Sequence, residues 1–77
     1  MTNNDRDIHR KRIGREMADI RRRRGMTQTE LAERCGLAQS HIARIETGRY
    51  SVGFDTLEQI AQAMGCEVRF TEVNNSE

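Results

Sequence analysis

The sequence predicts an all-α domain, a compact bundle of four helices, followed by a single C-terminal β-strand. Four segments carry apolar residues at the i, i+3 and i+4 spacing of an amphipathic helix. Each of them is followed by a glycine, which supplies the left-handed turn that commonly ends a helix. These glycines are Gly25, Gly36, Gly48 and Gly65. After the last of them the apolar period changes to strict alternation, and 77 residues leave room for one modest core.

The first helix is expected over residues 7–24. Its apolar stripe has the spacing i, i+4 and i+7 and consists of Ile13, Met17 and Ile20, with arginines around the rest of the helix. The chain ends, residues 1–6 and 74–77, are polar and contribute no apolar pattern. We therefore expect a disordered tail at each end and a helical domain over residues 7–65.

The second helix begins with a capping signal. Thr27 is its expected N-cap, and Glu30, three residues later, completes a capping box. The third helix is expected over residues 39–47 and the fourth over residues 54–64. The strand is expected over residues 66–73, where one face of the alternating pattern is made of Cys66, Val68 and Phe70.

Helices two and three are each about eight residues long, and helices shorter than ~12–15 residues are marginal in water. They must therefore be stabilised by packing on each other and on their neighbours. Two short helices joined by a three- or four-residue turn that contains glycine form a helix-turn-helix arrangement. The turn here is Gly36 to Ala38.

The outward face of the third helix is unusual for a merely solvated surface. It carries short side chains and few long ones, whereas solvated faces more often carry Glu and Lys in i, i+4 pairs. A helix that enters the major groove of DNA needs small residues and bidentate donors, because glutamine matches adenine and arginine matches guanine. Gln39 and Arg44 would supply those donors. Periodicity alone leaves the solvated face and the DNA-reading face about equally supported.

A longer pattern distinguishes these two interpretations. The stretch from Ile13 to Gly65 contains TQ-x-ELA-x(3)-G-x(5)-I-x-RIE-x-G and strongly resembles the Cro and phage-repressor-type helix-turn-helix family. The resemblance covers about fifty of the 77 residues. It implies a compact, lambda-repressor-like DNA-binding domain in which the third helix lies in the major groove of double-stranded DNA.

The resemblance also implies roles for individual residues. The implied DNA-binding residues are Gln28, Gln39, Ser40, His41, Arg44 and Arg49. Gln28 would contact the phosphate backbone and brace Gln39. Gln39 and Ser40 would meet base edges, and Arg44 would read a base or a phosphate deeper in the groove. His41 would lie near the DNA backbone and Arg49 would bind a phosphate. An ion pair between Arg21 and Glu46 would tie helix one to the end of helix three.

Two positions depart from the family pattern. Ala38 stands where the family usually has Ser or Thr as the cap of helix three, so we expect a weaker helix start, by about 1 kcal/mol. The loop before helix four lacks the proline that is often found there. The conformation of residues 49–53 is therefore not implied by the resemblance.

Composition excludes several other classes of protein. No apolar run approaches the ~20 residues that a membrane span needs, and the N-terminus lacks the apolar region of a secretory signal. No pattern supports a catalytic, metal or cofactor site, and Cys35 and Cys66 are expected to be reduced thiols. Residues 1–49 carry an excess of five positive charges and residues 50–77 an excess of four negative ones, which indicates a polyanionic partner for one face.

The predicted strand raises a question of hydrogen bonding, because no other segment of the chain alternates in the same way. An unpaired strand invites another chain, and helix-turn-helix proteins generally read two half-sites as dimers. We therefore predict a homodimer in which residues 66–73 of two protomers pair antiparallel and bind a palindromic operator. Val68 and Phe70 would then pack on Leu57 and Met64.

Together these features predict a transcriptional regulator that acts as a repressor, has no enzymatic activity and is located in the cytoplasm. It would be either associated with a bacterial nucleoid or encoded by a phage. The alternative is an antitoxin, which would bind a toxin protein through helix four and the strand and repress its own operon.

Overall fold

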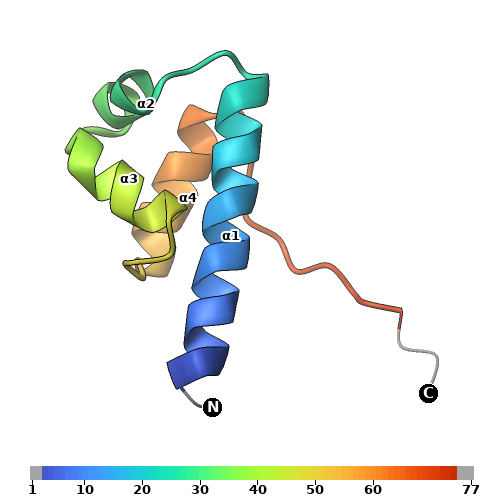
Figure 1. The fold of residues 1–77 in the computed structure, drawn as a ribbon. Coiled ribbons are helices and arrows are strands. Elements are labelled where there is room, and N and C mark those ends of the chain that lie inside the picture. The colour runs from blue at the N-terminus through green and yellow to red at the C-terminus, as the bar shows by residue number, and fades with distance from the viewer. Residues whose placement is uncertain (1–2, 75–77) are drawn as a thin grey trace.

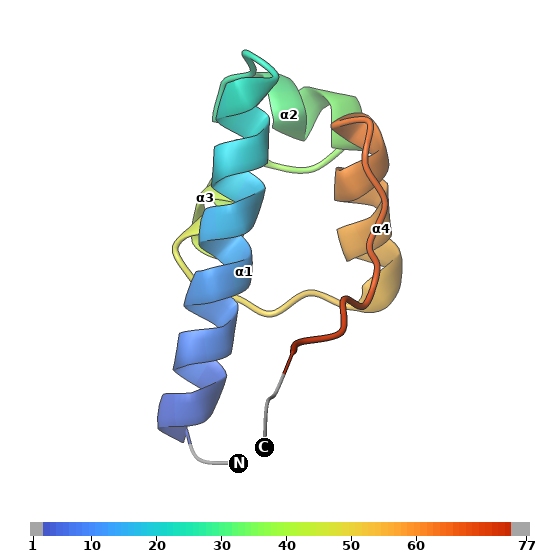
Figure 2. The same cartoon turned by 90° about the vertical axis from the view of Figure 1, so that its right-hand side faces the viewer.

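The computed structural model describes residues 3–74 and forms a bundle of four helices (Figure 1). In chain order they are α1 (Asn3–Arg23), α2 (Gln28–Cys35), α3 (Gln39–Glu46) and α4 (Phe54–Ala63). The long α1 runs the length of the molecule, and α2 bridges α1 and α4 at one end (Figure 2). α3 packs on both α1 and α2, and α4 packs on α2. The predicted all-helical, four-helix fold is confirmed.

The helix ends follow from local sequence signals. Thr27 accepts a hydrogen bond from the backbone N–H of Glu30, whose side chain accepts one from the N–H of Thr27, which completes the capping box. All four glycines predicted to end helices adopt positive φ, between 72° and 77°. α1 begins earlier than predicted, at Asn3. Residues 3–6 are therefore helical and not part of an irregular tail, while residues 1–2 and 75–77 lie outside the described range.

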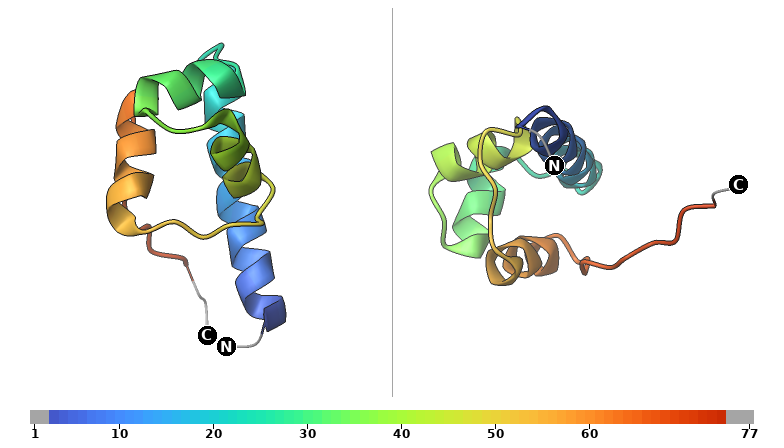
Figure 3. Two further views of the ribbon diagram at one scale, coloured as in Figure 1. Left: turned by 90° about the vertical axis from the view of Figure 1, so that its left-hand side faces the viewer. Right: turned by 90° about the horizontal axis from the view of Figure 1, so that it is seen from below.

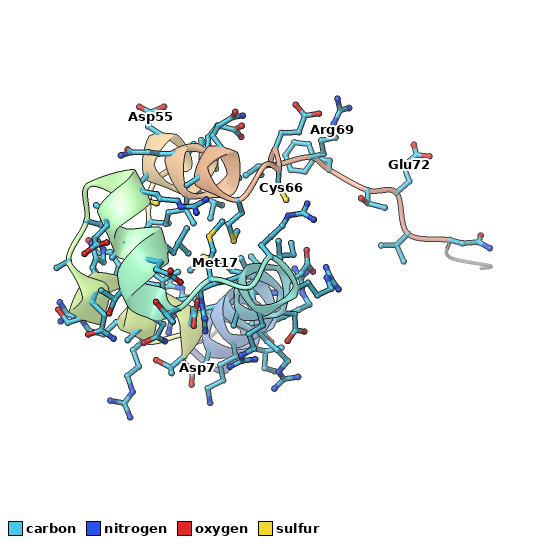
Figure 4. All side chains as sticks on the ribbon, turned by 90° about the horizontal axis from the view of Figure 1, so that it is seen from above. Asp7, Met17, Asp55, Cys66, Arg69 and Glu72 are labelled. Atoms are coloured by element: carbon cyan, nitrogen blue, oxygen red, sulfur yellow. The ribbon has the colours of Figure 1, made fainter. Side chains whose placement is uncertain are left out.

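The core is formed where α2, α3 and α4 meet the C-terminal half of α1. Its most deeply buried large side chains, all fully inaccessible to solvent, are Leu31, Ile42 and Ile60. Met17 points from α1 into the space between the helices (Figure 4). Ile13 was predicted to belong to the same stripe, but it remains 40% exposed. It lines a shallow pocket with Ile45, Val52 and Leu57, and the opening of this pocket leaves part of the side chain in contact with solvent.

The predicted strand does not form. Among residues 3–74 no strand is present, and residues 66–73 run as an extended segment that leads away from the helices (Figure 3, right). Phe70 is fully exposed and Val68 is half exposed, so neither is buried as predicted. Only Cys66 packs against the core. The physical reason is the absence of a second extended segment beside this one, since a strand exists only when its backbone groups are paired.

Candidate nucleic-acid interface

The helix-turn-helix unit consists of α2, the turn at residues 36–38 and α3. Gly36 adopts φ 72°, and Leu37 donates a backbone hydrogen bond to the carbonyl of Ala32, which closes the end of α2. α3 then starts at Gln39, and the side chain of its N-cap residue, Ala38, makes no capping hydrogen bond. A methyl group cannot accept from the free N–H groups of the first turn. The base-reading end predicted for α3 therefore begins without a side-chain cap.

The structure leaves four of the six predicted DNA-contacting residues exposed, whereas Gln28 and His41 are half-buried. Ile42 and Ile45 are buried against the core, so the opposite side of α3 faces solvent. Residues exposed there or in the turn that follows are Gln39, Ser40, Arg44 and Arg49. Gln28, the first residue of α2, lies next to Gln39 and is half-buried. This surface can present amide, hydroxyl and guanidinium donors together.

A chain of hydrogen bonds fixes the amide of Gln39. Its Nε2 donates to Oε1 of Gln28 over 2.7 Å, and Nε2 of Gln28 donates to Oε1 of Glu46 over 2.9 Å. An ionised carboxylate can only accept, so Glu46 requires the amide nitrogen of Gln28 to face it. The carbonyl oxygen of Gln28 is thereby turned toward Gln39. Gln39 in turn keeps its own Oε1 and one N–H available for another partner.

The same carboxylate forms a buried ion pair with Arg21. Arg21 donates from Nε to Oε2 of Glu46 over 2.7 Å and from Nη2 to Oε1 over 3.1 Å. A third donor, Nη1, binds the carbonyl of Met26 over 2.7 Å. Both residues are less than one tenth exposed. The hydrogen bond with Glu46 raises the pKa of Arg21, against the lowering effect of burial. This pair joins α1 to the C-terminal end of α3.

Sequence reasoning missed a close backbone approach between α1 and α3 at Gly14. A Cβ on Gly14 would lie 2.4 Å from the carbonyl oxygen of Ile45 and 2.6 Å from that of Glu46. Only a residue without a side chain allows the two backbones to come this near. An isolated glycine inside a helical pattern was the signal that could have indicated it. Gly14 thus sets the distance between the two helices.

The loop after α3 is ordered by ring packing. The rings of His41 and Tyr50 meet edge to face, with centroids 4.8 Å apart and an interplanar angle of 78°. Nε2 of His41 is buried and has no hydrogen-bond partner within residues 3–74. Arg49 follows Gly48 and donates its backbone N–H to the carbonyl of Arg44 over 2.8 Å. His41 therefore anchors the loop that carries Arg49.

The run Arg21–Arg24 divides into separate roles. Arg21 belongs to the buried pair, Arg24 donates from Nε to the carbonyl of Met64, and Arg22 lies 3.5 Å from Asp19 on the exposed surface.

No cluster of three or more potential metal ligands occurs within the described part of the chain. None of the described helices is long and apolar enough to cross a membrane.

The fold and this surface define a helix-turn-helix protein. The model of the family described as "Helix-turn-helix" matches residues 17–70, and the chain belongs to this family. The resemblance to Cro and phage repressors is thereby confirmed.

The relatives include regulators of phage and bacterial origin. The immunity repressor protein of Bacillus phage phi105 is 41% identical over 73% of this chain, which spans 39% of that repressor's length. The control protein C.BamHI of Bacillus amyloliquefaciens is 34% identical, and the match covers 100% of this chain and 96% of that protein. Among solved structures, the clp gene regulator ClgR from C. glutamicum has a TM-score of 0.75 at 29% identity, over 77% of this chain and 76% of that one.

Proposed function

We propose that this chain binds double-stranded DNA sequence-specifically through α3 and regulates transcription, most simply as a repressor. The observation that carries the proposal is the exposed face of α3, where Gln39 is oriented by a hydrogen-bonded chain that ends at a buried carboxylate. A solvated face has no need of such a support. The relatives named above are described as a repressor, a control protein and a gene regulator, which supports the regulatory role. None of those three is described as an antitoxin, so the names give that alternative no specific support.

In the proposed complex Gln39 reads adenine. Adenine offers a donor at N6 and an acceptor at N7 in the major groove, and Gln39 keeps one acceptor and one N–H for them. Arg44, one turn later, reads a guanine or binds a phosphate, and Ser40 contacts a base edge. Gln28 and Arg49 bind phosphates on either side of the groove. His41 acts close to the DNA backbone by holding the loop of Arg49.

Selection of binding sites from random duplexes tests this proposal. The wild-type chain should enrich one sequence, and Gln39→Ala or Arg44→Ala should relax preference at one position each, by ~1–3 kcal/mol. Arg49→Ala should weaken binding to all sequences and flatten its salt dependence. Full specific binding by all three variants would mean that α3 is not the reading helix.

We further propose that the regulator acts as a homodimer on a palindromic operator, with residues 66–73 of two protomers paired antiparallel. Two features support this. The extended segment leaves most of its backbone groups unpaired within residues 3–74, and it carries the exposed apolar side chains of Phe70 and Val73. Such a pairing is isologous and closes with two-fold symmetry. It would place two α3 helices on half-sites about one helical turn, ~34 Å, apart.

Light scattering at micromolar concentration tests the dimer. The full-length chain should have twice the monomer mass, and Phe70→Ser should shift it toward the monomer. Thr71→Ser, on the neighbouring position of the same segment, is the matched control and should leave the mass unchanged. A wild-type chain that is monomeric under these conditions would refute the proposed pairing.

A further inference from the structure

The N-terminal half of α1 passes directly beside the C-terminal end of α3. A Cβ on Gly48 would lie 2.6 Å from Cγ of Lys11, 2.9 Å from its backbone nitrogen and 3.0 Å from its Cα. Arg10, the neighbouring residue, donates from Nε to the carbonyl of Gly48 over 3.1 Å. The turn that carries Arg49 is therefore in backbone contact with α1. No part of the DNA-contacting set inferred from the family resemblance lies on α1.

The helical geometry of α1 shows which of its cations border α3. Gly14 marks the side of α1 that meets α3, since it is in contact with the carbonyls of Ile45 and Glu46. At 100° per residue, Lys11 lies about 60° and Arg15 about 100° from Gly14, both in the same direction. Ile13 lies about 100° away in the opposite direction, where it borders Leu57 of α4 in a shallow pocket. Lys11 and Arg15 therefore flank α3 on the side away from α4.

These two cations are available to an external ligand. Asp7 forms a hydrogen-bonded ion pair with Arg10 at 2.9 Å and a longer ion pair with the ammonium of Lys11 at 3.7 Å, beyond hydrogen-bond distance. The side chain of Lys11 is 60% exposed. Arg15 is exposed too, and no ion pair holds it within residues 3–74. An ammonium and a guanidinium on one flank of α3 thus keep most of their hydrogen-bond donors for another partner.

A purely structural role is the alternative for cations at this place. The C-terminal end of a helix carries a partial negative charge, which nearby cations stabilise. Here Arg10 already serves that role through its bond to Gly48. Lys11 and Arg15 donate to none of the free carbonyls of α3, so the dipole does not account for them.

A helix in the major groove lies between two phosphate backbones, because the groove is only ~12 Å wide. Gln28 borders α3 at its N-terminal end, and Lys11 and Arg15 border it toward its C-terminal end. We propose that Lys11 and Arg15 form an additional phosphate-binding site, which binds the DNA backbone beside Arg49, on the side of the groove opposite Gln28. This inference rests on the proposed DNA binding by α3 and extends the interface from the helix-turn-helix unit to α1.

The salt dependence of DNA binding tests the site. The probes are the duplex enriched by the wild-type chain and a scrambled duplex of the same length. Each lost phosphate contact should reduce the slope of log K against log salt by about 0.9, which is ~3.5-fold in affinity between about 50 and 200 mM salt. Lys11→Ala and Arg15→Ala should each show this loss on both duplexes while the base preference is kept.

Arg12→Ala is the matched control. Arg12 is exposed, carries the same charge on the same helix turn, and lies about 160° from Gly14, away from α3. The slope of log K against log salt for Arg12→Ala should stay at the wild-type value. The inference would be overturned if Lys11→Ala and Arg15→Ala gave the same salt-dependence slope as Arg12→Ala. Lowered melting temperatures with unchanged slopes would also overturn it, because they would indicate a structural role. If the wild-type chain enriches no sequence at all, the failure lies with the proposed function instead.

Discussion

Replacing Glu46 by alanine should remove the side-chain hydrogen bonds that tie α3 to Arg21 of α1 and to Gln28 of α2. The carboxylate accepts two hydrogen bonds from Arg21 and one from Gln28. Without it, Nε and Nη2 of Arg21 face a cavity with no acceptor, and only the bond from Nη1 to the carbonyl of Met26 remains. The guanidinium cannot lose its proton to escape the cost of burial, because arginine stays protonated in proteins. The variant therefore contains an unpaired buried charge.

The size of the effect follows from burial. The side chains of Arg21 and Glu46 are 8% and 4% exposed, so solvent cannot replace the lost partner without local opening. Removing one member of a buried, hydrogen-bonded pair costs about 3–5 kcal/mol. At roughly 0.05–0.15 kcal/mol per residue, a domain of this length has about 4–12 kcal/mol of stability in total. With about 4–8 °C per kcal/mol, the melting temperature should fall by at least ~12 °C.

Thermal melts followed by circular dichroism measure this loss. The control is Glu33→Ala, an exposed glutamate on α2, which should change stability by no more than about 0.5 kcal/mol. A double variant, Arg21→Met with Glu46→Leu, should recover much of the loss, because two apolar side chains can replace a buried ion pair at little cost. A Glu46→Ala melt that coincides with that of Glu33→Ala would refute the reasoning.

Three further predictions concern the same framework. Gly14→Ala should destabilise the fold by about 1–3 kcal/mol in denaturant melts, because its Cβ would lie 2.4 Å from a carbonyl oxygen. The control is Gly53→Ala, because nothing lies within 4 Å of a Cβ there. Equal unfolding midpoints for the two variants would contradict the prediction. Hydrogen bonds from Thr27 lower the pKa of Glu30, so its contribution is present above the unfolded pKa and is lost as pH falls through the folded one. Glu30→Ala should hence melt below wild type at pH 7 and together with it in acid; a gap that persists in acid would argue against the capping role. Gln28→Ala should relax base preference at the position read by Gln39, although Gln39 itself is unchanged; an unaltered selected sequence would show that Gln39 needs no brace.

Features set by local interactions could be predicted from the sequence. The capping box at Thr27 and the left-handed turns at Gly36 and Gly48 involve residues within a few positions of one another, and their signals are specific. The contact between Arg21 and Glu46 spans 25 positions, and only the family resemblance suggested it. Periodicity alone could not have matched these two residues, since it reports which face is buried and not which partner buries it.

Features that depend on how distant segments meet could not be predicted. Ile13 has the correct spacing for the core, but it lines a shallow pocket with Val52 and Leu57 and stays 40% exposed. The alternation of residues 66–73 indicates which backbone conformation is favoured, and the segment is indeed extended. A strand also requires a paired neighbour, and residues 3–74 of one protomer supply none. Figure 4 shows Cys66, Arg69 and Glu72 along this segment as it leaves the helices.

The way in which α3 is held explains why so short a helix can serve as a reading element. It has only eight residues, so its own hydrogen bonds cannot fix its direction. Glu46 anchors the C-terminal end and Ile42, fully buried, anchors the middle. The N-terminal end has no side-chain cap at Ala38, and its side-chain tether is the bond from Gln39 to Gln28. The proposed base-reading end of α3 is thus held by a hydrogen bond between two side chains in place of a cap, so the orientation of Gln39 depends on Gln28.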